Sequence, residues 1–291
     1  MNRIVTVSAP SRLHFGLYSV GQQERKFGGI GLMIKDPRHI IEITEIDPGQ
    51  APVLPGSTVT DAWVEKWRQG FAGNLPERFD PNRIHVTIGS DHLSPLPRHV
   101  GLGSGTQLAF GTAVGLSTFF QQTIPSPGEI AAVMGRAGRS AIGSYGFFQG
   151  GFLVDRGIGQ DDTIAPLDLR LEFPHQWPIV LALPVDQQGL SGHPETKAFQ
   201  QIQPTSPNCR HKMIERVRGE IVPALASSDY DSFAEALYEY GYGAGDHFSG
   251  IQDGPYNGPA ATRMVRKIRE LGVAATGQSS WGPCIFAIAR D

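Results

Sequence analysis

The chain has 291 residues, of which 40% are hydrophobic and 18% charged, and its formal net charge is −3 at pH 7. This balance predicts one large or two modest globular domains, and it excludes the basic footprint of a nucleic-acid-binding protein and a membrane-surface patch. The sequence offers no run of roughly 20 apolar residues for a membrane-spanning helix, no signal peptide and no C-x-x-C pair, so we expect a cytoplasmic protein in a reducing compartment.

The first part of the chain is predicted to contain mainly strands. Residues 4–7 alternate apolar and polar side chains, and residues 12–17 continue the alternation, with Arg12 and His14 on the face opposite the leucines. Arg12 and His14 either line a solvated sheet face or lie near a substrate. A glycine-rich turn at 27–32 leads into another strand. The further elements expected here are strands at 40–46 and 83–88 and a helix at 59–71.

A second glycine-rich loop, P-R-H-V-G-L-G-S-G-T-Q-L at 97–108, leads into a helix predicted from Thr106 to Phe120. Glycine lets the backbone turn sharply and approach a ligand. At a helix N-terminus such a loop presents free N–H groups and the positive end of the helix dipole, which together bind phosphate. The loop is neither a Lys-containing P-loop nor a G-x-G-x-x-G motif, because Thr106 stands where the third glycine should be. A tight turn without a ligand is the structural alternative.

The segment 138–155, which reads G-R-S-A-I-G-S-Y-G-F-F-Q-G-G-F-L-V-D, follows a helix predicted to begin at Ser126 with Pro127 and Glu129 in its first turn. It has no Asp or Glu between positions 139 and 149, and Ser144 and Tyr145 are its candidate reactive side chains. A boundary between two halves is predicted near 160–172. Beyond it we expect a buried strand at 177–184, a loop at 186–195, helices at 211–225, 230–242 and 259–271, and a strand, Gly/Ser turn and strand at 274–288.

Five segments of the chain resemble the GHMP superfamily, the galactose, homoserine, mevalonate and phosphomevalonate kinases. The loop at 97–108 resembles their motif 2, P-x-x-x-G-L-G-S-S-x-A, except that Gly105 replaces the second serine. The strings H-V-G-L-G-S-G-T-Q at 99–107 and Q-S-S-W-G-P at 278–283 are similar to a non-kinase branch, the β-ribofuranosylaminobenzene 5′-phosphate synthases. The matching segments are 12–17, 27–32, 97–108, 138–155 and 277–283.

The resemblance implies an α+β, GHMP-kinase-like fold in two lobes with the site in the cleft between them. Residues 1–165 would form an N-terminal half like the second domain of ribosomal protein S5. Residues 166–291 would form a ferredoxin-like half, whose motif 3 at 277–283 folds back against the loop at 97–108. A homodimer is a further expectation that comes from the resemblance.

The absence of Asp and Glu between positions 139 and 149 distinguishes the two chemistries that the resemblance allows. GHMP kinases carry an Asp there as proton acceptor, and loss of a general base costs roughly 10²–10⁴-fold in rate. The synthase branch instead implies a decarboxylating transfer of a ribosyl phosphate from phosphoribosyl pyrophosphate to 4-aminobenzoate or 4-hydroxybenzoate, an early step of methanopterin biosynthesis. The alternatives are an ATP-dependent small-molecule kinase that uses Asp155 or Asp186 as its base, and a binding module without catalysis.

The resemblance and the residue chemistry together give the expected site. Mg²⁺ is the expected cofactor, bridging pyrophosphate oxygens, and no metal ligands are identified. Arg12 first and Arg98 second would pair with the benzoate carboxylate. The candidates are Arg12, His14, Ser144 and Tyr145 for catalysis, His99, Gly101, Gly103, Ser104, Gly105 and Thr106 for phosphate binding, and Arg98, Gln278, Ser279 and Ser280 for substrate binding.

Overall fold

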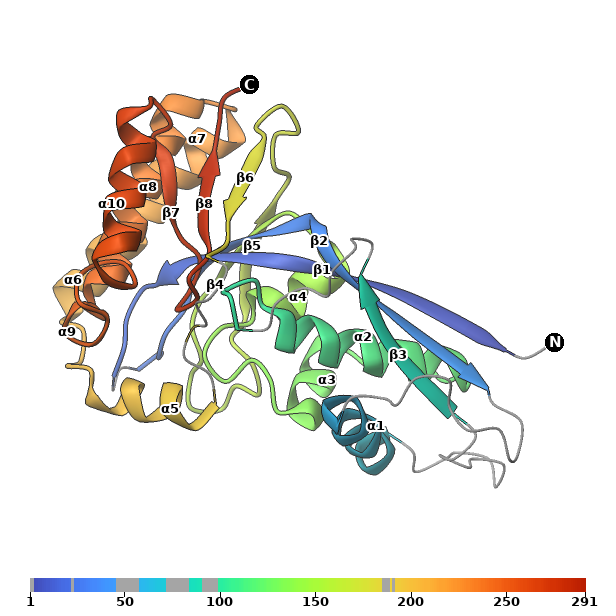
Figure 1. The fold of residues 1–291 in the computed structure, drawn as a ribbon. Coiled ribbons are helices and arrows are strands. Elements are labelled where there is room, and N and C mark those ends of the chain that lie inside the picture. Colours follow the sequence, from blue (N-terminus) through green and yellow to red (C-terminus); the bar gives the residue numbers. More distant parts are fainter. Residues whose placement is uncertain are drawn as a thin grey trace.

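The structure, a computed structural model, describes residues 3–21, 24–45, 58–71, 84–90, 99–184, 189 and 192–291. Two antiparallel sheets, each covered by helices, form an α+β fold in two halves (Figure 1), which confirms the predicted fold class. No helix in these described ranges is long and apolar enough to cross a membrane.

The first sheet is organised around one long strand. The strands are β1 (Ile4–Leu17), β2 (Gly29–Glu45), β3 (Ile84–Ser90), β4 (Phe152–Asp155) and β5 (Leu167–Leu171). β2 pairs with β1 on one side, and on the other side its first residues pair with β4 and its last residues with β3. The two strand segments predicted at 4–7 and 12–17 are therefore one strand, interrupted by register shifts. β5 pairs with β4, so the first sheet extends past residue 165, where the sequence predicts the division.

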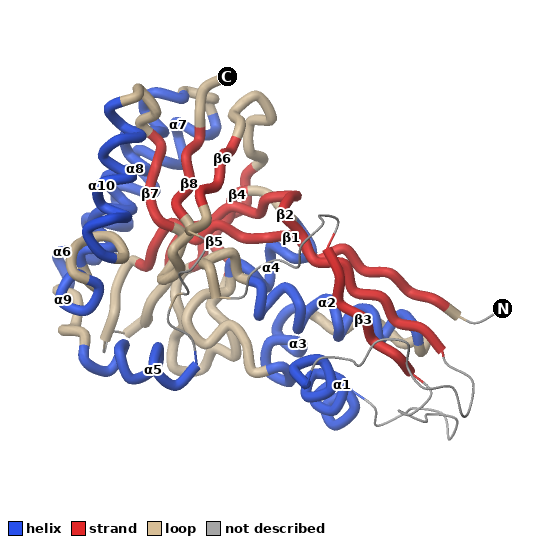
Figure 2. Tube along the Cα trace, viewed as in Figure 1, coloured by secondary structure: helices blue, strands red, loops and turns tan. Residues whose placement is uncertain are grey.

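Four helices lie on one side of the first sheet (Figure 2): α1 (Thr58–Phe71), α2 (Ser104–Phe119), α3 (Pro127–Met134) and α4 (Ile142–Gln149). Helices α2 and α4 pack against the sheet itself, and α1 and α3 pack against α2. Leu108, Phe110 and Leu116 of α2 are fully buried, and two glycines of this helix pack closely against β2. A Cβ on Gly111 would lie 2.3 Å from Ile41, and one on Gly115 would lie 2.7 Å from Ile43. The capping box that begins α3 at Ser126 is also present.

The second half contains a three-stranded sheet in the order β6-β8-β7. Its strands are β6 (Ile179–Ala182), β7 (Ala275–Gln278) and β8 (Ile285–Ile288). The sequence predicts a buried strand at 177–184, and this is wrong in one respect: β6 is an edge strand, and Val180 is 63% exposed. The helices are α5 (Gly192–Gln201), α6 (Pro207–Arg216), a π-helical turn (Val217–Ile221), α7 (Val222–Ala226), α8 (Tyr230–Asp246), α9 (Ser249–Gln252) and α10 (Gly258–Glu270).

One hydrophobic core joins the two halves. Leu13 and Phe15 of β1 are buried in the same cluster as Phe233 and Tyr240 of α8. The Tyr240 hydroxyl also donates a hydrogen bond to the backbone oxygen of Gly16 at 2.9 Å. Burial of aromatic and aliphatic side chains on this scale is the main stabilising force in a domain. The position of α8 relative to β1, and with it the shape of the cleft between the halves, is therefore fixed by core packing.

Candidate anion and substrate site

The glycine-rich loop adopts the geometry that its sequence predicts. Gly101 and Gly103 have φ values of 96° and 72°, in the left-handed region that favours glycine. α2 begins at Ser104, two residues before the predicted start, and the N–H groups of Thr106 and Gln107 already donate to the oxygen of Gly103. The N–H groups at the very start of a helix have no helical acceptor, so the first turn of α2 can bind an anion.

The hairpin between β7 and β8 holds this loop against β1. The Ser279 hydroxyl donates to the oxygen of Gly101 at 2.7 Å and accepts the N–H of His14 at 3.0 Å, and the N–H of Ser280 donates to the oxygen of His14. A Cβ on Gly101 would lie 2.2 Å from the backbone oxygen of Ser279, and a Cβ on Gly282 would lie 2.1 Å from the backbone nitrogen of Gly101. Three segments that are far apart in the sequence are thus locked together, as the resemblance implied.

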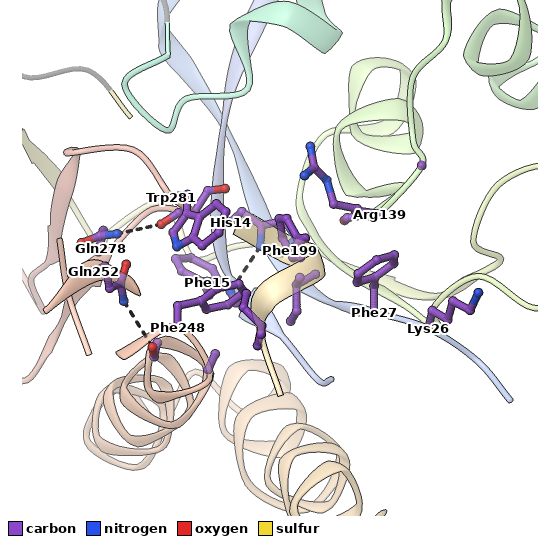
Figure 3. Close-up of a pocket in the computed structure, with 18 of the residues that line it drawn as sticks. His14, Phe15, Lys26, Phe27, Arg139, Phe199, Phe248, Gln252, Gln278 and Trp281 are labelled. Carbon is purple, nitrogen blue, oxygen red and sulfur yellow. Dashed lines mark hydrogen bonds between the residues drawn. The ribbon is translucent and has the colours of Figure 1, made fainter. Parts of the chain in front are cut away.

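A cavity of about 970 Å³ lies beside these segments, between the two halves. Figure 3 shows part of its lining, with Arg139 and Lys26 on one side and Gln252 and Trp281 on the other. The described residues that line it include four cations, and none of them is Asp or Glu. The cations are Arg12, Lys26, Arg136 and Arg139.

Two of these cations reach the start of α2. A Cβ on Gly103 would lie 3.1 Å from Nε of Arg12, and one on Gly105 would lie 3.3 Å from Nη1 of Arg136. The Arg136 guanidinium lies over the Trp63 ring at 5.7 Å, and its buried Nε has no hydrogen-bond partner among the described residues. A side chain at position 105 would press on Arg136, so the glycine that departs from motif 2 leaves room for this cation.

His14 is uncharged at neutral pH in this site. Burial, and then the charges of Arg12 and Arg139, lower its pKa well below the usual value. The N–H of Gly16 donates to Nδ1 at 3.3 Å, so the proton of the neutral ring lies on Nε2. Nε2 is buried and has no partner within the described part of the chain. The ring therefore has one hydrogen-bond donor left for a ligand of the cavity.

Several predicted site residues do not line the cavity. Ser144 is fully buried inside its own half, and Tyr145 is partly buried against Met33 and Leu153. Neither residue lines the cavity. Their predicted catalytic role is not supported by this geometry. His99 is exposed outside the cavity, and Arg98 lies outside the described residues.

The residues predicted for substrate binding at 278–280 divide into two kinds. Both ends of the Gln278 amide are used, since Oε1 accepts the N–H of Asn257 at 2.6 Å and Nε2 donates to the oxygen of Ser280. Gln278 nevertheless lines the cavity, as does Ser280. Ser279 is fully buried and positions the loop instead of facing a ligand. Among the predicted phosphate-binding residues Thr106 lines the cavity. Gly101 and Gly103 lie in the adjoining loop, and Ser104 and Gly105 lie in the first turn of α2.

The carboxylate of Asp155, the candidate base of the kinase alternative, does not line the cavity either. It is fully buried and accepts hydrogen bonds from Ser140 Oγ at 2.9 Å, Ala141 N at 3.0 Å and Gly157 N at 3.0 Å. Burial raises its pKa to about 6. It therefore fixes two turns at the ends of the segment 140–157. The other candidate base, Asp186, lies outside the described residues.

Sequence reasoning missed part of the cavity lining. Lys26 flanks one segment that carries the resemblance and Arg139 lies within another, but a lone cation beside glycines gives no specific signal. The aromatic side chains of Phe27, Phe199, Phe248 and Trp281 line the cavity from four separate segments, and no spacing in the sequence connects them.

Comparison with known proteins places these features in a family. Residues 69–150 match the family model described as "GHMP kinases N terminal domain", and residues 221–291 match the model described as "GHMP kinases C terminal". A curated relative from Methanothermobacter thermautotrophicus, 27% identical over 98% of this chain and 88% of its own, is named beta-ribofuranosylphenol 5'-phosphate synthase. A relative from Archaeoglobus fulgidus with the same name is 29% identical over 80% of this chain and 74% of its own.

Solved structures show the same fold at low identity. Phosphomevalonate kinase from Streptococcus pneumoniae superposes with a TM-score of 0.65 at 14% identity, over 99% of this chain and 92% of its own. Mevalonate pyrophosphate decarboxylase from Streptococcus pyogenes gives a TM-score of 0.68 at 10% identity, over 99% and 89%.

Proposed function

The chain belongs to the GHMP kinase superfamily, and we propose that it is a pentosyltransferase of the β-ribofuranosylphenol 5′-phosphate synthase type. Its donor is phosphoribosyl pyrophosphate and its acceptor a 4-substituted benzoate. The two relatives are named for a phenol product, which favours 4-hydroxybenzoate over 4-aminobenzoate as the acceptor. The proposal includes a role early in methanopterin biosynthesis and a cytoplasmic location.

The observation that carries the proposal is the charge of the cavity. A chain of net charge −3 gathers four cations in one cavity beside a helix N-terminus, and no described lining residue is acidic. Phosphoribosyl pyrophosphate has a pyrophosphate at one end and a phosphate at the other, so it needs cations and N–H donors along its length. Arg12, Arg136 and the first turn of α2 suit the pyrophosphate, because guanidinium groups and helix N-termini bind phosphate oxygens in a charge-assisted manner.

The reaction requires one bond to form and two to break. The bond between ribose C1 and pyrophosphate breaks ahead of the others, and its electron pair leaves with the pyrophosphate. The ring carbon that carries the carboxylate attacks C1, and loss of CO2 returns the electron pair of the carbon–carboxylate bond to the ring. The transition state resembles the oxocarbenium ion of other glycosyl transfers, so cations fixed at the departing pyrophosphate stabilise the charge that develops there.

The neutral His14 ring contributes a hydrogen bond and not a positive charge. Its Nε2–H is directed by the Gly16 bond and is available to an oxygen of the donor. A neutral donor is suitable beside a ribose that becomes positive in the transition state, since an imidazolium charge at that place would oppose the reaction. Arg12 and Arg139, which help to keep His14 neutral, thus also determine its role.

The proposal includes Mg²⁺ only as an ion bound by the pyrophosphate of the substrate, not by side chains of the protein. No group of three or more His, Cys, Asp or Glu among the described residues could hold a metal ion. The cavity lining, without a described carboxylate, likewise does not fit a protein-held divalent cation. Mg²⁺ commonly keeps its waters and binds through substrate phosphates, so it can enter the site with its donor.

A paired assay on purified protein tests the function. One reaction contains phosphoribosyl pyrophosphate, Mg²⁺ and carboxyl-labelled 4-hydroxybenzoate or 4-aminobenzoate, and the other contains ATP and a panel of small alcohols. We expect labelled CO2 and pyrophosphate in equal amounts from the first reaction alone, with one of the two acids preferred. ADP in the second reaction without CO2 in the first would refute the proposal in favour of a kinase, and ligand binding without turnover in either would indicate a binding protein.

A further inference from the structure

We infer, on the basis of the proposed function, that the aromatic end of the cavity is the acceptor subsite and that Gln252 recognises the para substituent of the benzoate. The subsite consists of the rings of Phe199, Phe248 and Trp281, with Arg139 at one end and Gln252 at the other. It is distinct from the anion-binding end at the start of α2.

The three rings form one continuous wall. The ring centroids of Phe199 and Trp281 are 4.8 Å apart, those of Phe248 and Trp281 4.7 Å, and those of Phe199 and Phe248 5.5 Å. Phe199 and Trp281 are only partly buried, so both retain surface that faces the cavity they line. Partly exposed aromatic surface inside a cavity suits a planar ring, because aromatic pairs gain from stacked or edge-to-face packing.

An amide oxygen that can accept a hydrogen bond lies at one end of this wall. Gln252 lines the cavity and is 8% exposed. Its Nε2 donates to the backbone oxygen of Gly245 at 3.2 Å, which fixes the orientation of the amide, since that partner can only accept. Its Oε1 is buried and has no hydrogen-bond partner in the described part of the structure. A buried acceptor left in this state is costly, and a ligand O–H or N–H satisfies it.

A cation lies at the other end. The Arg139 guanidinium carbon is 4.6 Å from the centroid of Phe199, and its charge also acts on His14, which borders the loop of α2. The order along the cavity is therefore cation, aromatic rings and acceptor (Figure 3). A 4-hydroxybenzoate has a carboxylate, a ring and a hydroxyl donor in the same order, and in this orientation its carboxylate end lies toward the anion-binding end.

This orientation also assists the reaction. The ring carbon that carries the carboxylate attacks the ribose, so it must lie toward the donor. As that bond forms, the para oxygen becomes more positive and its O–H more acidic. A hydrogen bond from this O–H to Gln252 Oε1 therefore strengthens in the transition state, which is the condition for an effect on kcat and not only on binding.

Calorimetric binding of 4-hydroxybenzoate and of benzoate tests the subsite. Pyrophosphate and Mg²⁺ are present, so that no turnover occurs. The wild-type protein should prefer 4-hydroxybenzoate, and Gln252→Leu should weaken 4-hydroxybenzoate by about 5–10-fold while it leaves benzoate nearly unchanged. Phe199→Leu should weaken both acids by about 3–10-fold. Pyrophosphate affinity should stay at the wild-type value in both variants.

Matched controls make the same types of substitution outside the cavity, at Phe148 and Gln149, which are exposed and adjacent to each other in the sequence. Phe148→Leu and Gln149→Leu should leave the affinity for both acids unchanged. If Gln252→Leu keeps the preference for 4-hydroxybenzoate, or loses affinity for both acids equally, the recognition role is wrong. Should Gln252→Leu not fold, Phe199→Leu decides the subsite alone: an unchanged affinity for both acids refutes it.

The paired assay separates this inference from the proposed function. A wild-type protein that releases CO2 and pyrophosphate supports the function, whatever the variants do. In that case an unaltered KM for 4-hydroxybenzoate in both Gln252→Leu and Phe199→Leu refutes the subsite alone. A wild-type protein without turnover refutes the function, and the subsite with it.

Discussion

Replacing Ser279 by alanine should destabilise the whole protein, because its hydroxyl connects three separate segments. The hydroxyl is fully buried, donates to the Gly101 oxygen and accepts the His14 N–H. In Ser279→Ala both backbone groups lose this partner inside the protein. An unsatisfied buried group costs about 1–3 kcal/mol, so we expect a loss of about 2–4 kcal/mol in the free energy of unfolding.

Urea unfolding followed by far-UV circular dichroism measures this loss. The matched control is Ser280→Ala, because Ser280 is exposed and adjacent in the chain, and its removal should change the unfolding free energy by less than about 0.5 kcal/mol. A domain is stable by only about 5–15 kcal/mol, so the expected loss is readily detected. If Ser279→Ala unfolds within about 0.5 kcal/mol of the wild type, the hydroxyl does not hold the loop and the reasoning is refuted.

Three further predictions concern the charges and glycines of the site. Arg136→Gln should weaken pyrophosphate binding, measured by calorimetry, by roughly 10–100-fold. The control Arg263→Gln, at an exposed position on α10, should leave the affinity unchanged. Equal pyrophosphate affinities in the two variants would exclude Arg136 from the site. The pKa of Asp155 is raised to about 6, so the folded state binds the carboxyl proton more tightly than the unfolded state does. The contribution of this carboxyl group to the free energy of unfolding is therefore full below about pH 4, and it falls by roughly 3 kcal/mol as the pH rises through 6. Asp155→Asn should remove this pH dependence from urea unfolding, and parallel curves for the two proteins would contradict it. Gly101→Ala should lower the free energy of unfolding by at least about 2 kcal/mol, because the new Cβ would lie 2.2 Å from the backbone oxygen of Ser279. Gly128→Ala, where the Cβ would meet no other atom, should leave it unchanged. Similar urea midpoints for the two variants would contradict the close contact at Gly101.

The elements of the fold could largely be predicted from local signals. The helix at 127–134 follows from its capping box, and the hairpin at 275–288 follows from two apolar runs around a Gly/Ser turn. Whether β5 joins the first sheet could not be predicted, because strand pairing depends on distant residues and not on the strand itself. The exposure of β6 was missed for the same reason: its position at a sheet edge is set by pairing with β8.

The anion-binding end of the site was predictable and the acceptor end was not. Glycines before a helix carry a backbone signal that is local in sequence, so the loop at 101–106 could be identified, and Arg12 follows from its strand. The partner cations Arg136 and Arg139 come from a turn whose position depends on the packing of α3 and α4. Ser144 and Tyr145 were placed in the site because they lie near a motif position, but Ser144 is buried, Tyr145 packs against Met33 and Leu153, and neither lines the cavity.

The core shared between β1 and α8 limits how this protein can be recombined with its relatives. A chimera joined near residue 165 would pair one parent's Phe15 and Gly16 with the other parent's Tyr240 and Ala244. A Cβ on Gly16 would lie 2.2 Å from the Ala244 Cβ, so the two positions must change together. Exchange of halves should therefore succeed only between parents that match at this contact, and substitutions at positions 16 and 244 should covary among descendants of the same ancestor.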